Sequence, residues 1–485
     1  MDIFKLNKIQ HLNKSRLFSG VILISSPWLI LFVFSIITGH LISESVPVWS
    51  DELAYWHEIL SLSQKGLQHG YYTYNEVAPV LSSFGSHGFG TVTVYALFAQ
   101  VFGWKTYSIV IANTFFMSLA FLFLFIMLKP TAKIICFVLL FTVSYSPYLL
   151  FSVTSMSEGL NYALLIVYFV FLYAFIQRDN MVLFLSLLAI CTAFSLVRII
   201  YIVLFLPVLF IRNKESKFDF KLLIYALFWL VFSAILFVVN GRFISPYPDS
   251  FLKELFSAIG ITGKVSLFAV HFADNLLNFV NPFSDNLLQV LERYFTLVVL
   301  IYSLLKSGMM HSKQKKIEIR YFVVFLILFL VLLITFGAYD VFDWRDYRVL
   351  APVLYGCVLY LILNANSFEL SGLLAVNVLV LVFLIFTPQT CKLFSDGRYS
   401  KPLKNNVLAR IKYTNNASNC FDNTLAVKSF NQQTVLSLPV GIGITTVDSL
   451  SDLLHSKYIY TEKILDFKTY KLIDFDRWGY LYSKR

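Results

Sequence analysis

Residues 17–56 read "LFSGVILISSPWLILFVFSIITGHLISESVPVWSDELAYW" and join a long apolar run to a short acidic and aromatic segment. The run at 17–42 is long enough to cross a bilayer, for which about 20 apolar residues suffice as a helix. Asp51 and Glu52 follow it among tryptophan and tyrosine side chains. Ser50 can cap a helix, and acids are favoured in a first turn because the helix N-terminus is partly positive. The stretch therefore predicts a membrane helix and then a second helix that begins with two carboxylates.

Composition places the whole chain in the membrane class. Of its 485 residues, 58% are hydrophobic and 14% are charged, an apolar content that a bundle of lipid-exposed helices requires. The net charge of +11 comes from lysines and arginines in short segments between apolar runs. Such segments are typical of cytoplasmic loops, so the positive charge indicates membrane orientation and we expect no nucleic-acid partner. The basic N-terminus has no clear cleavage site after it and predicts a retained first helix.

Apolar runs of spanning length recur along the chain. The stretch 181–211 is too long for one simple span and carries Arg198 near its middle, so we expect two short helices that meet at this arginine. Together with these two, the sequence predicts an all-α polytopic membrane bundle of about eleven spans. The other predicted spans are 17–42, 107–128, 134–153, 160–176, 222–240, 287–305, 321–339, 349–363 and 370–387.

The basic segments predict the orientation of this bundle. The N-terminus and the segments at 129–133, 177–180, 212–221 and 306–320 all fall on one side, which should be cytoplasmic. These basic segments share one side only if 88–104 does not cross the membrane, because a span there would place the basic segment 129–133 on the outer side. We therefore expect 88–104 to be an amphipathic helix at the outer interface, inside a first periplasmic loop that covers 43–106.

The polar tail differs from the rest of the chain. We expect a transmembrane domain over 1–387 and a small periplasmic α/β domain over 388–485, with the inner membrane as location. Within the tail, 432–440 and 470–475 are predicted as strands and 445–456 as a short capped helix.

The positions of cysteine and histidine give little indication of disulfide bonds or metal sites. Cys391 and Cys420 both fall in the predicted periplasmic tail, where a disulfide can form if their geometry permits it. No Cys/His spacing typical of a metal site occurs in the sequence. No cofactor is required by the pattern, although neighbouring carboxylates leave a divalent cation open.

Several ionisable residues are predicted to converge on the outer face. Each has a structural alternative: an acid can begin a helix, an arginine can snorkel to the headgroups, and Arg345 can pair with a neighbouring aspartate. Ionisable groups at membrane depth are costly and usually line a working cavity. Carboxylates can accept a proton from an attacking hydroxyl, and arginines can hold a phosphate through forked hydrogen bonds. The residues concerned are Asp51, Glu52, Glu158, Arg198, Arg345 and Arg348.

Five short stretches follow one another in a fixed order along the chain. They are "WSDELAYW" (49–56), "SHGFGTVTVYALFAQVFGW" (86–104), "YSPYLLFSVTSMSE" (145–158), "AFSLVRI" (193–199) and "WRDYRVLAPVL" (344–354). In this order they resemble the GT-C class of integral-membrane glycosyltransferases, which use polyprenyl-phosphate-linked sugars. The resemblance covers about residues 17–387 and does not reach the tail.

The resemblance implies roles for individual residues. Asp51 matches the catalytic base, with Glu52 beside it, and Glu158 matches the second-loop acid that supports the acceptor or, in some members, a metal. Asn113 stands where many relatives carry an arginine, so one phosphate contact is missing or comes from elsewhere, for example from Arg293. Arg198, Arg345 and Arg348 match arginines that bind the donor phosphate, and His87 and Tyr55 are expected near the substrate.

These observations predict a membrane glycosyltransferase. The expected donor is a polyprenyl-phosphate sugar, with glucose favoured, and the expected acceptor is a periplasmic saccharide such as O-antigen or lipopolysaccharide. Within the class, the chain is similar to bacterial or phage-encoded serotype-converting glucosyltransferases. Two alternatives stay open: a transporter or flippase for a lipid-linked saccharide, and a polymerase or ligase that uses lipid-diphosphate donors.

Overall fold

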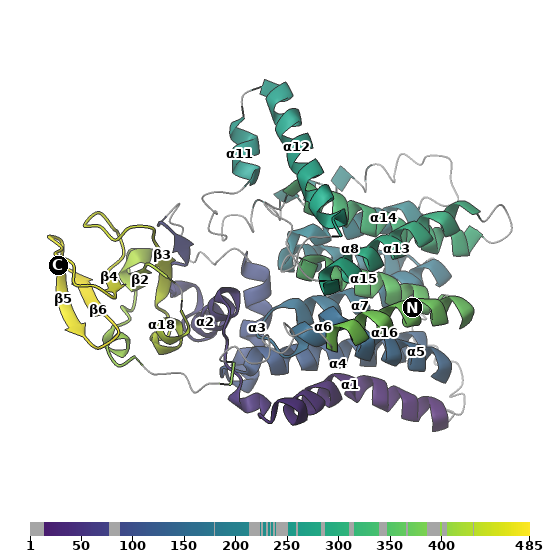
Figure 1. Ribbon diagram of the computed structural model, residues 1–485, viewed down its shortest axis with the longest axis horizontal. Helices are drawn as coiled ribbons and strands as arrows, with labels where there is room; N and C mark the ends of the chain where they lie inside the picture. The colour runs from purple at the N-terminus through teal and green to yellow at the C-terminus, as the bar shows by residue number, and fades with distance from the viewer. Residues whose placement is uncertain are drawn as a thin grey trace.

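The structure is a computed structural model, in which a helical bundle carries a small sheet-containing unit at one end (Figure 1). This arrangement confirms the predicted class, an α-helical membrane bundle with a small C-terminal α/β unit. The structure describes residues 14–76, 88–178, 180–212, scattered positions from 224 to 238, 251–258, 260–282, 287–309, 315–338, 347–364, 367–385, 398–399, 405–429 and 431–485.

The bundle consists of long helices around a buried centre formed by α7 and α15. Gly356 of α15 lies so close to α7 that a Cβ atom there would come within 2.5 Å of the Phe169 ring. The helices are α1 (Lys14–Thr38), α4 (Ser108–Leu128), α5 (Ala132–Ser144), α6 (Ser146–Ser152), α7 (Glu158–Arg178), α8 (Met181–Val197), α9 (Phe205–Arg212), α11 (Phe251–Ser257), α12 (Gly260–Val280), α13 (Leu287–Met309), α14 (Lys315–Ala338), α15 (Tyr347–Ile362) and α16 (Ser367–Ile385).

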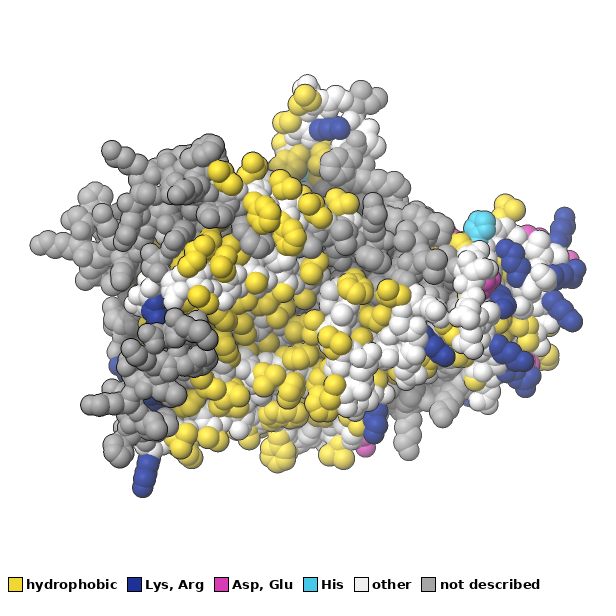
Figure 2. Space-filling view, turned by 180° about the vertical axis from the view of Figure 1, so that it is seen from behind, with side chains coloured by type: hydrophobic (Ala, Val, Ile, Leu, Met, Phe, Trp, Pro, Cys, Tyr) yellow, Lys and Arg dark blue, Asp and Glu magenta, His cyan; other side chains and the backbone are white. Residues whose placement is uncertain are grey.

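Among the described residues, four helices are long and apolar enough to cross a membrane. These are α1, α4, α7 and the segment Ile319–Gly337 of α14, and the pair α5 and α6, bent by 65°, makes a fifth if it is one span. On the face seen in Figure 2, apolar side chains spread over the described part of the bundle, and lysines and arginines gather over the sheet unit. The chain is therefore a multi-pass membrane protein. The span predicted at 222–240 falls largely outside the described residues.

In the middle of the chain, one prediction is confirmed and two further helices occur. The predicted break at Arg198 is confirmed, because α8 ends at Val197 and a 3-10 turn begins at Ile199, with Arg198 in an extended conformation between them. Between the predicted spans 222–240 and 287–305, where no helix was predicted, the structure contains α11 and α12. Polar residues interrupt the apolar residues of α12, so this helix has no span-length apolar run and its periodicity is amphipathic.

Residues 88–102 do form a helix, α3 (Gly88–Phe102), which packs against α2 (Ser50–Lys65). Two tryptophans join the middle of α2 to the residues that follow α3. Trp104 donates from its indole nitrogen to the Trp56 carbonyl at 3.0 Å, and Trp56 donates to the Lys105 carbonyl at 3.0 Å. The helix is therefore held against α2, and its place at the outer membrane interface stays a prediction.

The terminal unit is one six-stranded sheet of order β1-β3-β2-β4-β6-β5. Strands β1, β3, β2 and β4 pair with one another in parallel, in that order. Strand β6 is antiparallel to both of its neighbours, β4 and β5. The edge strand β1 comes from the first loop, so the sheet is shared between two distant parts of the chain. Its strands are β1 (Thr73–Tyr74), β2 (Thr424–Val427), β3 (Gly443–Thr446), β4 (Tyr458–Thr461), β5 (Tyr470–Phe475) and β6 (Tyr480–Lys484).

Within the tail, the strand predicted at 470–475 is confirmed as β5. The strand predicted at 432–440 is wrong, because Asn431 caps a short helix, α18 (Gln432–Ser437), by accepting from Thr434 N. The helix predicted at 445–456 is also wrong. Its first residues belong to β3, and the Asp448 carboxylate accepts hydrogen bonds from Tyr74, at the end of β1, and from Asn75, which follows it.

The first loop and the tail pack as one body. Leu53 of α2 lies in a hydrophobic core with Leu425, Val435 and other residues of the sheet unit. Gly70 lies so close to the tail that a Cβ atom there would come within 1.8 Å of the Asn423 carbonyl oxygen, so only glycine fits. The start of α2, where Asp51 and Glu52 stand, is therefore held between the bundle and the sheet. The domain boundary at 387/388 stays a prediction.

Candidate active site

The two acids at the start of α2 point to different environments. Glu52 is 0% exposed, and its Oε2 accepts from the backbone amides of Val48 at 2.7 Å and Trp49 at 3.1 Å. A glutamate at the third helical position commonly satisfies the free amides of a helix start in this way. Asp51 is 30% exposed at its side chain and points away from this cap. Adjacent positions on a helix face about 100° apart, which separates the two carboxylates.

The second loop, residues 153–157 between α6 and α7, directly precedes Glu158 and is held by three hydrogen bonds. Glu52 Oε1 accepts from the amide of Ser155 at 2.8 Å. Asn113 donates to the Met156 carbonyl at 2.7 Å, and Ser157 Oγ donates to the Tyr55 hydroxyl at 3.2 Å. Asn113, the position at which the resemblance led us to consider an arginine, is thus a buried anchor for this loop.

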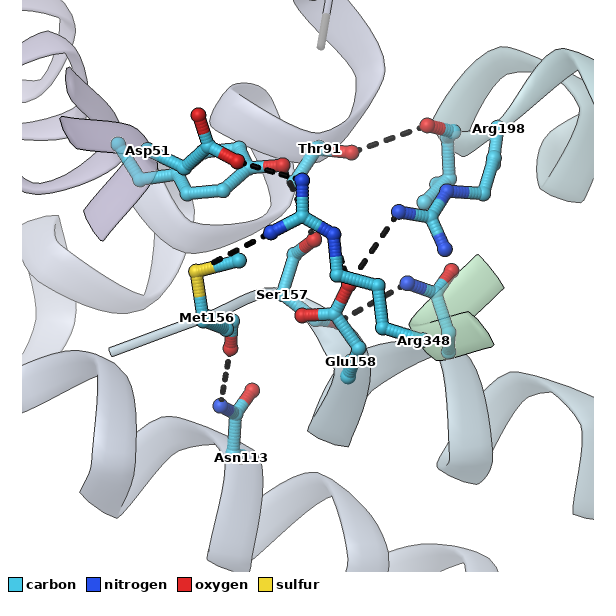
Figure 3. A network of polar contacts seen from close by, with 11 residues as sticks. Asp51, Thr91, Asn113, Met156, Ser157, Glu158, Arg198 and Arg348 are labelled. Atoms are coloured by element: carbon cyan, nitrogen blue, oxygen red, sulfur yellow. Dashed lines mark hydrogen bonds and ion pairs between the residues drawn. The ribbon is translucent and has the colours of Figure 1, made fainter. Parts of the chain in front are cut away.

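Four charged side chains from four elements meet beside this loop (Figure 3). Arg348 Nη2, at the start of α15, lies 2.6 Å from Asp51 Oδ2. Its Nε lies 3.9 Å from Glu158 Oε1, which also pairs with Arg198 Nη2 at 3.3 Å. Glu158 is 1% exposed, so the two arginines share a buried carboxylate, while Asp51 closes the group on its more exposed side. The structure therefore brings together four predicted residues: Asp51, Glu158, Arg198 and Arg348. The first and the last of them, Asp51 and Arg348, are 297 positions apart in the sequence.

The break in the helix at Arg198 is stabilised by α3. Thr91 Oγ1 donates to the Val197 carbonyl at 3.0 Å, and a Cβ atom on Gly90 would come within 2.1 Å of the Leu196 carbonyl oxygen. The close approach of α3 therefore satisfies a backbone acceptor that the interrupted helix leaves open. Arg198 therefore stands in an extended conformation at the end of α8, where its side chain reaches Glu158.

Tyr55 lies next to the charged group and is buried. Burial, and after it the negative charge of Glu158, raises the pKa of Tyr55 well above its usual range. The phenol therefore remains protonated at neutral pH and acts as a neutral hydrogen-bonding group. Its expected place near the substrate stays a prediction.

One further ion pair was not anticipated from the sequence. Arg398 Nη1 lies 2.8 Å from Glu52 Oε1, and both side chains are buried. Its guanidinium also lies over the Trp49 ring, with 5.4 Å between the guanidinium carbon and the ring centroid. Arg398 belongs to the polar tail, and its local sequence contains no signal that distinguishes it from the other basic residues there.

The remaining predicted residues divide into two groups. His87, Arg345 and Cys391 lie outside the described residues. Arg293, considered as a substitute phosphate ligand, is buried in α13, where its Nη1 donates to the Asn278 carbonyl of α12 at 2.5 Å. Across the described part of the chain, no group of three or more His, Cys, Asp or Glu residues could hold a metal ion.

The arrangement combines a partly exposed carboxylate with two guanidinium groups whose charges are balanced by carboxylates. Such a group can bind an anion by exchange of an ion-pair partner, and it can accept a proton at the carboxylate that is released.

Comparison with known proteins adds a distant structural likeness. No family model matches the chain, and no curated protein matches it. The chain is similar in structure to a crystal structure of ArnT from Cupriavidus metallidurans bound to undecaprenyl phosphate. The TM-score is 0.40 and the identity 11%, over 96% of this chain and 97% of that chain. At this degree of likeness, the roles of the residues depend on their own geometry.

Proposed function

We propose that this protein is a GT-C-type membrane glycosyltransferase that transfers a sugar from a polyprenyl-phosphate donor to a saccharide acceptor. The observation that carries the proposal is the Asp51–Arg348 ion pair at 2.6 Å, set at the more exposed edge of the Glu158–Arg198 pair. It joins a candidate base to a candidate phosphate ligand. The reaction needs both functions within one site.

The proposed reaction uses an exchange of partners at Arg348. The donor phosphate binds Arg348 and Arg198, and Arg348 thereby releases Asp51. Asp51 then accepts the proton of an acceptor hydroxyl while the hydroxyl oxygen attacks the anomeric carbon. The bond from the anomeric carbon to the phosphate oxygen breaks, and polyprenyl phosphate leaves with its bonding electrons. Direct displacement of this kind inverts the anomeric configuration.

Glu158 has a different proposed role from Asp51. At 1% exposed, its carboxylate is in contact with both arginines, so it orients them and limits their repulsion. The incoming phosphate adds negative charge to a group that is neutral in total, since two carboxylates face two guanidiniums. When Asp51 moves toward solvent and the acceptor, the electrostatic cost of adding the phosphate charge falls.

The finer assignments belong to the same proposal. The site lies on the periplasmic side of the inner membrane, the N-terminus is cytoplasmic, and the sheet unit is periplasmic. Glucose as the sugar, and O-antigen or lipopolysaccharide as the acceptor, follow from the family resemblance. Mass analysis of surface polysaccharide from cells with and without the gene identifies the added sugar.

The decisive experiment compares Asp51→Asn with Asp474→Asn in proteoliposomes supplied with undecaprenyl-phosphate glucose and lipopolysaccharide. Asp474 is a matched control, because it forms an ion pair with Arg410 at 2.8 Å in the sheet unit. Loss of the base should lower transfer by about 10²–10⁴-fold, whereas the control should transfer normally. Normal transfer by Asp51→Asn overturns the proposal. Donor movement across the membrane without transfer by the wild type favours the flippase alternative.

A further inference from the structure

We propose that Arg398 is a positioning residue for this site. In this proposal its buried ion pair with Glu52 clamps the first outer loop to the second and so fixes where Asp51 and Glu158 lie. The kinetic part of the inference rests on the proposed function, whereas the structural part does not. The tail thereby becomes a component of the active site.

Glu52 is the centre of the clamp. Its two carboxylate oxygens accept from three separate parts of the chain: the amides of Val48 and Trp49 before α2, the amide of Ser155 in the second loop, and Arg398 Nη1 in the tail. All four donor–acceptor distances lie between 2.7 and 3.1 Å. A carboxylate that is 0% exposed is stable only with such full compensation.

Arg398 supplies the only positively charged side chain paired with Glu52 among the described residues. The segment that carries it is itself tied to the bundle side. Its carbonyl accepts from Val46 N at 2.8 Å, and the ring of Tyr399 stacks on His40 with 4.6 Å between centroids. A second contact runs from Gln432 Nε2 to the Pro47 carbonyl at 2.8 Å. Arg398 is therefore held in place through its backbone carbonyl and its neighbour Tyr399 as well as through its side chain.

Asp51 and Glu158, the two acids of the proposed site, are close in sequence to residues of this clamp. Asp51 immediately precedes Glu52, and Ser155 lies three residues before Glu158. If Arg398 is removed, the Glu52 carboxylate stays buried without its cation, and either the carboxylate or the loop must move. Because Glu52 Oε1 bonds both Arg398 and Ser155, the second loop is the first neighbour affected.

The test uses the full-length protein in detergent and compares Arg398→Met with Arg410→Met. Arg410 is the matched control, because it pairs with Asp474 at 2.8 Å in the sheet unit but is 66% exposed. Hydrogen exchange followed by mass spectrometry reports the Ser155 amide through peptides that cover 153–157. In Arg398→Met this amide should exchange at least about tenfold faster, since it loses the fixed acceptor, and the control should match the wild type.

Kinetics supply the second readout. Arg398→Met should lower kcat per folded enzyme at least about tenfold with a donor KM within about threefold of wild type, because the phosphate ligands remain. If Arg398→Met does not fold, Arg398→Lys retains the charge with fewer donors and should give intermediate values of both readouts.

Unchanged Ser155 exchange in the folded variant overturns the clamp, whatever the activity. Raised exchange with wild-type kcat overturns the positioning role and leaves a purely structural pair. If the wild type transfers no sugar, the proposed function fails, and the exchange measurement still decides the clamp.

Discussion

Asp51 and Glu52 are neighbours in the chain, and each forms an ion pair with a distant arginine. Asp51 pairs with Arg348, 297 positions away, and Glu52 pairs with Arg398, 346 positions away. The Asp51 side chain is 30% exposed, whereas Glu52 is fully buried and bonded on both oxygens. The Asp51–Arg348 pair can therefore change partners when an anion arrives. The Glu52–Arg398 pair cannot, because separation would leave a charge buried without compensation.

The difference shows how one helix start can serve two purposes. Helical geometry sends consecutive side chains to different sides, so a pair of acids can place one carboxylate in the core and one in the site. Partly exposed ion pairs contribute little to stability and exchange readily, whereas breaking a buried pair costs several kcal/mol. We expect variants of the two pairs to separate activity from stability.

The largest effect should come from Arg348→Met. Loss of a charged group that stabilises the leaving phosphate should lower kcat/KM by about 10²–10³-fold, equal to about 3–4 kcal/mol in the transition state. The unfolding free energy should fall by much less than the roughly 3–5 kcal/mol expected for breaking the buried pair in Arg398→Met. Steady-state kinetics and thermal unfolding in the same detergent measure the two quantities.

Arg348→Lys is the conservative companion. It keeps the charge but loses the forked donors, so its kcat/KM should lie between those of wild type and Arg348→Met. If Arg348→Met lost as much stability as Arg398→Met, the distinction between an exchangeable and a fixed pair would be wrong.

The second prediction concerns the buried face of α2, which holds Glu52 against the sheet unit. His57 on this helix is buried, with Nδ1 2.7 Å from the Tyr72 hydroxyl. Burial, and after it the neighbouring His69, lowers the pKa of His57 to about 4. The unfolded chain takes up this proton near the ordinary histidine pKa of about 6.5. The contribution to stability is therefore complete above that pH and is lost as pH falls from about 6.5 toward 4.

Between pH 7 and pH 5 this linkage should reduce the unfolding free energy by about 2 kcal/mol. Unfolding followed against pH in wild type and His57→Gln isolates the effect, because the variant lacks the titrating group. Equal slopes for wild type and His57→Gln would show that His57 is not held neutral by this packing.

Much of this architecture follows from local sequence. Apolar runs identify most long helices, and an arginine inside a long run marks the break at Arg198, because both signals lie within one segment. The stripe Glu52, Trp56 and Ile59 at helical spacing also places Glu52 on the apolar face, a signal that distinguishes it from Asp51.

Other features have no local signal. Arg398 is one basic residue in a polar tail, and its partner lies 346 positions earlier. Strand β1 is two residues long and exists because β3 offers it a parallel edge, so no periodicity can reveal it. The helix α12 was missed because a search for span-length apolar runs overlooks an amphipathic helix.

The smallest effect should come from Tyr55→Phe, which removes a neutral contact between the same two loops that Glu52 joins. Ser157 Oγ donates to the Tyr55 hydroxyl at 3.2 Å, and a neutral hydrogen bond contributes about 0.5–1.5 kcal/mol. We therefore expect a stability loss of about 1 kcal/mol and a decrease in kcat of no more than about tenfold, with the pH profile of kcat unchanged. A displaced pH profile would show instead that the phenol takes part in proton transfer. Because burial, and after it Glu158, keeps this phenol protonated, the loops are joined here by a neutral bond, and in the proposed reaction the proton acceptor is Asp51.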